Sequence, residues 1–217
     1  TAFLFYRLSL KNKLSDGGRN KSNGGENNNK EPSKKRELSH YYSHLKTVSL
    51  AQGFFGFVGG STVSFLPLFL TDVHKLSVST AGGMLTLFLA GGLVGKMIGG
   101  RYSDIWGPRR IISIGFLITS FFLILVPLIP GFSLTLVLLP AGIAFFMILP
   151  ALFVLTGKIK TTDLGLAYGI QLSSGAAFGA ASKFLCGVIS DMVGIEYIFF
   201  LLSAVAFFAA IFVIRKF

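Results

Sequence analysis

The residues best suited to chemistry lie in a short charged stretch between two long apolar segments. They follow the pattern G-x3-D-x2-G-x-R-R and are Gly100, Asp104, Gly107, Arg109 and Arg110. The chemistry that they support is electrostatic: Asp104 can sit near the positive end of a helix dipole, and the arginine pair can anchor the next helix at a membrane surface. Gly107 permits a positive φ, and Pro108 favours a first helical turn. The alternative is a charged turn that only fixes the topology of two helices.

The charged residue placed deepest in an apolar stretch is Lys183. A charge at membrane depth costs free energy and often marks a functional site. In one interpretation Lys183 faces a central cavity, where it attracts an anionic substrate or pairs with an acidic residue. In the other, its side chain reaches the membrane interface, towards Asp191 two turns further on. Lys96 lies nearer the end of its own stretch, where reaching the interface is the better explanation.

Uncharged polar side chains in the apolar stretches form a second set of candidates for the substrate cavity. They are Gln52, Thr62, Tyr168 and Gln171. Single polar residues in membrane helices usually hydrogen-bond a neighbouring helix. Both roles, helix contact and substrate contact, therefore stay open for each of them.

No pattern in the sequence predicts an enzyme or a metal centre. The chain lacks a G-x-S-x-G elbow, an H-E-x2-H pair, a phosphate-binding loop and paired carboxylates in apolar stretches. His40 and His44 have helical i, i+4 spacing but no further ligand nearby, and the lone Cys186 excludes a disulfide within the chain. We expect no cofactor, although coupling to a proton or ion gradient stays open.

The composition predicts a protein embedded in a lipid bilayer. Of the 217 residues, 52% are hydrophobic and 13% charged, and the mean hydropathy is +0.69. The net charge of +11 lies mostly in loops, without a basic patch interleaved with aromatic residues, so we expect no nucleic-acid partner. Six apolar stretches approach the ~20 residues that cross a bilayer as a helix. They are 47–70, 80–100, 109–128, 132–156, 164–190 and 197–214.

The charges of the connections predict how these stretches are oriented. The basic connections are 11–46, 101–110, 158–160 and the tail 215–216. The neutral or acidic connections are 71–79, 127–131 and 191–196. Positive charge collects on the cytoplasmic side of membrane proteins. We therefore expect the 11–46 segment and the C-terminus in the cytoplasm, in a multi-pass protein of the cell membrane.

The chain divides into three predicted parts. Residues 1–10 are apolar but too short to cross a bilayer, and we interpret them as the end of a preceding transmembrane helix, in a chain that is a fragment. Residues 11–46 are basic and include a stretch rich in Asn, Gly, Ser and Lys, which predicts a low-complexity linker. Residues 47–217 form a six-helix bundle.

Glycines recur with helical spacing in two of the stretches and predict close helix packing. They are Gly91, Gly95 and Gly99 in the second stretch, and Gly175, Gly179 and Gly187 in the fifth. Small residues four apart let two helix backbones approach closely in lipid. The pattern predicts static packing first, and it is also compatible with helices that slide against one another.

The charged stretch resembles the cytoplasmic loop signature of the major facilitator superfamily, which recurs once in each six-helix half of those transporters. Its place after the second span corresponds to family helices 8 and 9. The resemblance implies an all-α bundle that is the C-terminal half of a twelve-helix fold, with the N-terminal half absent here. It also implies that the signature belongs to a gating network, and that the first, second, fourth and fifth spans contribute to the cavity.

Three details bear on this resemblance. The segment 65–70 (FLPLFL), Ala81-Gly82 and the glycine-rich fifth span are similar to the fosmidomycin-resistance and related drug-efflux branch. Family members usually carry a basic residue just after the aspartate, where this chain has Ile105 and Trp106. The pattern G-x3-D-x2-G occurs again from Gly187 to Gly194 without the arginine pair, where we interpret it as a helix end and turn.

The resemblance implies secondary active transport of a small solute by alternating access, as an efflux or organic-anion carrier. Two alternatives stay open. A six-helix channel or pore subunit would function from this chain alone. A membrane scaffold without transport would tolerate changes at Asp104 and Lys183.

Overall fold

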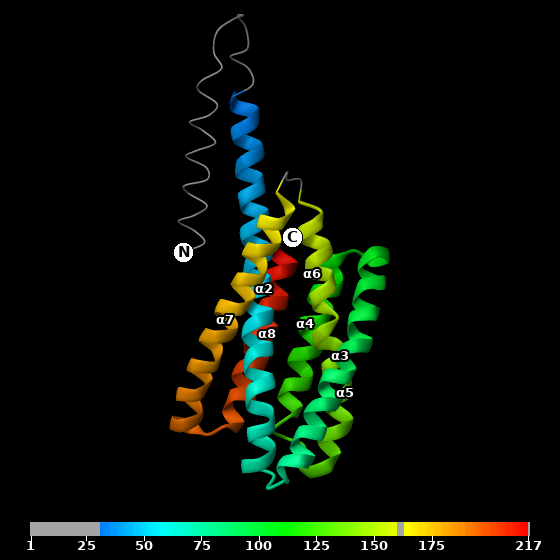
Figure 1. The fold of residues 1–217 in the computed structure, drawn as a ribbon, viewed down its shortest axis with the longest axis vertical. Helices are drawn as coiled ribbons and strands as arrows, with labels where there is room; N and C mark the ends of the chain where they lie inside the picture. Colours follow the sequence, from blue (N-terminus) through cyan, green and yellow to red (C-terminus); the bar gives the residue numbers. More distant parts are fainter. Residues whose placement is uncertain (1–30, 160–162, 217) are drawn as a thin grey trace, which may run out of the picture. The chain divides into compact units, whose positions relative to one another are not determined.

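The computed structural model describes residues 31–159 and 163–216, with side chains from His44 onward. Within these residues the chain is helical and has no strand, which confirms the predicted all-α class (Figure 1). The elements are α2 (Glu31–Asp72), α3 (Val78–Trp106), α4 (Pro108–Leu125), η1 (Gly131–Leu134), α5 (Thr135–Phe146), α6 (Ile148–Gly157), α7 (Leu164–Val193) and α8 (Glu196–Lys216). Six spans among them are long and apolar enough to cross a membrane.

The first helix is longer than the sequence predicts. We expected a linker to residue 46, whereas α2 begins at Glu31. Pro32 occupies the first turn, where a proline needs no N–H partner, and no glycine or proline follows until Gly53. The predicted helix end at 1–10 and the linker at 11–30 lie outside the described residues.

The fourth span is divided into two helices. Helix α5 ends at Phe146 and α6 begins at Ile148. Pro150 has no N–H, so the carbonyl oxygen of Phe146, four residues earlier, receives no helical hydrogen bond. The chain turns slightly at Met147, whose N–H still reaches the Ile143 carbonyl at 3.1 Å.

Helices α4 and α8 pack against each other through paired serines. Ser120 Oγ donates to the Ser203 carbonyl at 2.9 Å, and Ser203 Oγ donates to the Ser120 carbonyl at the same distance. Both side chains are buried. Hydroxyl groups that bond a facing backbone hold two helices together where lipid offers no other partner.

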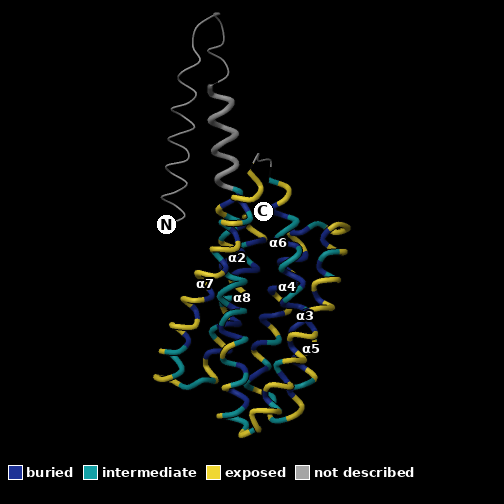
Figure 2. The backbone as a smooth tube through the Cα atoms, viewed as in Figure 1, coloured by how far each residue is buried: buried dark blue, intermediate teal, exposed yellow. Residues whose placement is uncertain are grey.

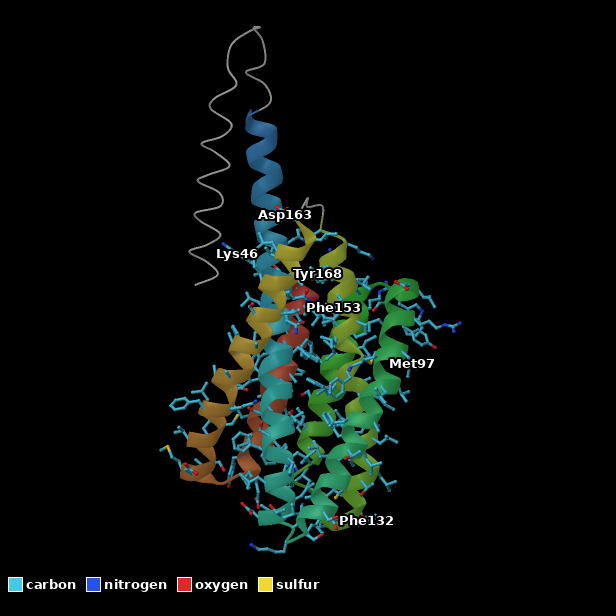
Figure 3. All side chains as sticks on the ribbon, in the orientation of Figure 1. Lys46, Met97, Phe132, Phe153, Asp163 and Tyr168 are labelled. Carbon is cyan, nitrogen blue, oxygen red and sulfur yellow. The ribbon has the colours of Figure 1, made fainter. Side chains whose placement is uncertain are left out.

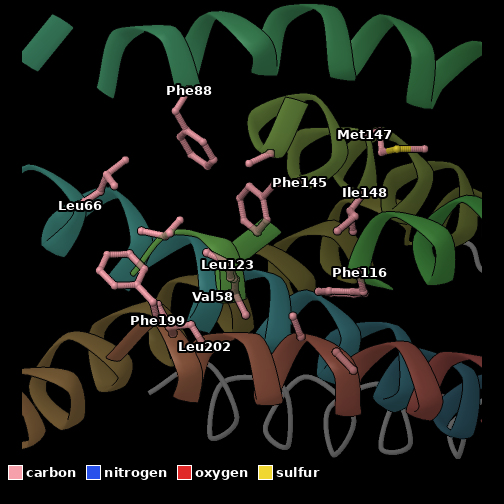
Figure 4. Packing of buried hydrophobic residues seen from close by; sticks show 14 of the residues in the cluster. Val58, Leu66, Phe88, Phe116, Leu123, Phe145, Met147, Ile148, Phe199 and Leu202 are labelled. Carbon is pink, nitrogen blue, oxygen red and sulfur yellow. The ribbon is translucent and has the colours of Figure 1, made fainter. Parts of the chain in front are cut away.

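The core of the bundle, which comprises Ser43–Phe217, is rich in phenylalanine. Phe145 stacks on Phe55 of α2 at 4.4 Å between ring centroids. It also lies near Phe88 of α3, with 6.2 Å between the ring centroids (Figure 4). These rings join three helices near the α5–α6 break. Among the six spans, the fourth is the most buried: 56% of its most apolar 18 residues are buried. Helix α7 is the least buried, with 11% (Figure 2).

Candidate functional site

The charged stretch is almost entirely helical. Helix α3 runs on to Trp106 and α4 starts at Pro108, so Gly107 alone reverses the chain, and the predicted ten-residue turn is shorter than expected. Gly107 has φ 87° and ψ 143°, a conformation that favours glycine, and Pro108 is the first residue of α4. The predicted roles of these two residues in the turn are confirmed. A one-residue link keeps the end of α3 next to the start of α4.

The charged side chains of the signature point away from the bundle. Asp104, Arg109 and Arg110 are exposed, whereas Ser103 is buried and its hydroxyl has no hydrogen-bond partner within the described residues. Trp106, half exposed, lies with its ring 4.9 Å from that of Tyr102. The Asp104 carboxylate and the Arg110 guanidinium are therefore presented to whatever adjoins this end of the bundle. Their role in gating stays a prediction.

The two lysines in the spans have different surroundings. Both are exposed. Lys96 Nζ lies 5.3 Å from the centroid of the Phe146 ring, within the range of a cation–π interaction. Lys183 lies on α7, the least buried span, where a side chain can meet lipid or another protein. The structure thus leaves both interpretations of Lys183 open.

Three buried polar residues form a hydrogen-bonded chain across α2, α6 and α7. Thr156 Oγ1 donates to Gln171 Oε1 at 2.6 Å, and Gln171 Nε2 donates to Gln52 Oε1 at 3.2 Å. All three are at most 4% exposed. In this conformation the two predicted cavity glutamines bond each other, so a substrate would reach them only if this chain of bonds opened.

The two remaining cavity candidates differ in access. Tyr168 is half-buried where α6 and α7 meet, and its hydroxyl donates to the Phe153 carbonyl at 3.2 Å (Figure 3). Thr62 is buried, and its hydroxyl has no hydrogen-bond partner among the described residues. Contact with a substrate stays a prediction for both.

Five of the six predicted packing glycines lie where two helices cross closely. A Cβ atom at Gly91, Gly95 or Gly99 would collide with carbonyl oxygens of the fourth span. A Cβ atom added at Gly175 would lie 2.9 Å from Gln52 Nε2, and one added at Gly179 would lie 3.0 Å from the Gly56 carbonyl oxygen. At Gly187 a Cβ would meet only the Phe65 ring, at 4.0 Å, so this glycine lies apart from the crossing.

One protein-family model matches most of the chain. The model described as "Major Facilitator Superfamily" matches residues 48–217, from the first span to the end. The chain belongs to the Major Facilitator Superfamily. The comparison with curated proteins gives no match.

A solved facilitator structure shares the fold. The E. coli fucose:proton symporter FucP, solved as a single-site variant, matches with a TM-score of 0.71 and 15% sequence identity. The match covers 83% of this chain and 45% of FucP, so this chain spans about half the length of that protein. At this identity the likeness shows the fold alone. The finer resemblance to the drug-efflux branch stays a prediction.

The sequence alone did not predict two of the contacts described above. The contact between Lys96 and Phe146 needs the α3–α5 crossing, which the glycine spacing predicts without naming its partner helix. Thr156 joins the glutamine chain, and a lone threonine at the end of the apolar fourth span was the available signal. No three His, Cys, Asp or Glu side chains of the described segments come together to bind a metal.

Proposed function

We propose that this chain is one half of a secondary transporter that carries a small solute across a membrane by alternating access. The observation that carries the proposal is the superfamily match over all six spans, with the loop signature at the end of α3. In such transporters two helix bundles rock about a binding site that lies between them. The proposed partner is a second six-helix half, and the proposed energy source is a proton or ion gradient.

The packing supports a bundle that moves as one body. Helix α3 is joined to α4 through Gly107 alone and meets the fourth span backbone to backbone. The stacked rings of Phe55 and Phe145 join α2 to the same span. Packed interiors resist gradual deformation, so a movement of one helix is transmitted to its neighbours. The exposed faces of α3 and α7 are then the surfaces against which the second half would move.

The charge pattern supports an orientation. Arg101, Arg109 and Arg110 lie at the end of the bundle where α3 ends, and Arg215 and Lys216 close α8. By the positive-inside rule this end is the cytoplasmic one. Lys183 on α7 then lies towards the outer face, where it can attract an organic anion or pair with a carboxylate of the second half.

The test is solute uptake by proteoliposomes that contain the full-length transporter, with and without a pH gradient. The solutes are a panel of organic anions, sugars and drugs. We expect gradient-driven uptake in the wild type and its loss in Asp104→Asn. Asp72→Asn, which removes an exposed carboxylate at the end of α2, serves as the matched control and should transport normally. Fast flux that needs no gradient and ignores Asp104→Asn would contradict the proposal and indicate a channel.

A further inference from the structure

The end of α3 and the end of α7 carry the same sequence pattern, K-x3-G-x2-S-D-x2-G. It starts at Lys96 in α3 and recurs 87 positions later, at Lys183 in α7, with Asp104 and Asp191 as its carboxylates. Both helices end at its last glycine in similar backbone conformations: φ 87° and ψ 143° at Gly107, φ 115° and ψ 151° at Gly194. The two copies are therefore equivalent in backbone structure as well as in sequence.

The packing around the two copies is also equivalent. Helix α3 crosses α5 and helix α7 crosses α2, each at closely approaching small residues. Three contacts between α3 and α5 each have an equivalent between α7 and α2. With the α3 or α7 residue named first, Phe88–Gly142 corresponds to Gly175–Gly56, Gly91–Leu139 to Phe178–Gly53, and Gly92–Phe146 to Gly179–Gly60. In each pair the α7 residue is 87 positions after the α3 residue, and the α2 residue is 86 positions before the α5 residue. The correspondence thus extends from the helix ends into the crossings.

The two copies lie at opposite ends of the bundle. Helices α3 and α7 run in opposite directions, so α3 ends where α7 begins (Figure 1). In each copy the lysine, the glycine and the aspartate are four residues apart and lie along one side of the helix. We name these sets the Lys96 stripe (Lys96, Gly100, Asp104) and the Lys183 stripe (Lys183, Gly187, Asp191).

Both stripes face outward from the bundle. Their lysines and aspartates are exposed. A Cβ added at Gly100 would meet no atom within 4 Å, and one at Gly187 would meet only the Phe65 ring at 4.0 Å. No carboxylate of the described residues pairs with either lysine. A lysine that only reaches the membrane interface needs neither a glycine nor a carboxylate on the same side of its helix.

The lysines differ in one respect. The Lys96 ammonium lies over the ring of Phe146. At the position near Lys183 that corresponds to Phe146, the chain has Gly60. Gly60 and Gly179 bring α2 and α7 together there, so the space that a ring would need is closed. The Lys183 ammonium is thus held by no ring and is free to take a carboxylate from outside the bundle.

We infer that the Lys183 stripe is the counterpart of the Lys96 stripe at the other membrane face, and that each stripe binds the second six-helix half when that face is closed. This inference rests on the proposed function and deepens it. The partner at each stripe is a helix of that half which brings a carboxylate to the lysine and a basic group to the aspartate. Because the stripes lie at opposite ends, opening one face separates the stripe at that face from the second half while the other stripe stays engaged.

The test measures access from each face of the full-length transporter in oriented vesicles. All cysteines are replaced, with Cys186→Ser in this chain, and one reporter is added: Ala90→Cys in α3 or its exposed equivalent Ala177→Cys in α7. Labelling uses a membrane-impermeant maleimide. If the stripes close opposite faces, Lys183→Gln should raise labelling of the α7 reporter from the face at which α7 ends by about two- to fivefold, the range that an exposed ion pair supports.

Lys96→Gln should produce the opposite shift, raising labelling of the α3 reporter from the face at which α3 ends. Lys183→Arg, which keeps the charge, should label like the wild type, and Lys46→Gln, a charge loss outside both stripes, should have no effect. Unchanged labelling in Lys183→Gln would overturn the inference, even if uptake of anionic solutes were weakened, because Lys183 would then bind the solute. A wild-type reporter that is labelled from one face only would instead contradict alternating access itself.

Discussion

At the scale of single residues, Gly142 shows how closely these helices approach. A Cβ atom at this position would collide with the Phe88 carbonyl of the facing helix, whose backbone cannot yield as a flexible side chain would. We expect Gly142→Ala to destabilise the folded transporter by about 1–3 kcal/mol, the usual cost of overpacking. The measurement is the thermal unfolding midpoint of the purified protein in detergent.

Gly83→Ala is the matched control for this substitution. Gly83 also lies in a helix, but a Cβ there would meet no atom within 4 Å. Alanine is the better helix former by ~1 kcal/mol, so this variant should be as stable as the wild type or more stable. Equal midpoints for Gly142→Ala and Gly83→Ala would show that the α3–α5 contact is looser than described.

The paired glutamines allow a second test at this scale. Gln171→Leu removes the partner of the Gln52 amide and leaves it buried without its hydrogen bond. Single and double leucine variants should show a coupling energy of about 0.6–1.7 kcal/mol, the range found for hydrogen bonds between membrane helices. Unfolding in mixed detergent micelles measures it. A coupling near zero, with uptake lost in each single variant, would favour direct contact with the solute.

At the scale of elements, Pro150 divides the fourth span. Pro150→Ala supplies the missing N–H and should join α5 and α6 into one straighter helix. We expect a higher unfolding midpoint and a lower maximal uptake rate at unchanged solute affinity, because the break lies where α3, α5 and the stacked rings meet. Pro140→Ala, in the first turns of α5, is the control and should change the rate less. An unchanged rate for Pro150→Ala would show that the break has no part in the movement.

The elements also show how far the sequence alone can predict this protein. Hydropathy predicted all six spans, because a bilayer requires each to be about 20 residues long and to form its backbone hydrogen bonds within a helix. The turn at Gly107 was predicted in kind but not in length, since nothing local shows whether residues 101–106 form a loop or the last turns of a helix. The glutamine chain and the Lys96–Phe146 contact depend on which helices are neighbours, and spacing within one helix does not give that.

At the scale of the whole molecule, the exposed faces of α3 and α7 bear on whether this chain can act alone. If it is half of a transporter, its six helices should insert into a membrane but carry no solute against a gradient. Co-expression with the other half of the full-length protein, as a separate chain, should restore uptake, because the stripes on α3 and α7 supply contacts that need no covalent link. The measurement is uptake in cells that produce one half, the other, or both.

The doubly neutralised variant Lys96→Gln with Lys183→Gln sharpens this prediction. It removes one lysine from each stripe and leaves the buried crossings intact, so the chain should still insert while restoration by the other half falls. Restoration that is untouched by this variant would place the contacts between the halves elsewhere on the bundle. Uptake by the chain alone would mean that six helices suffice, and the pore interpretation would then replace the half-transporter.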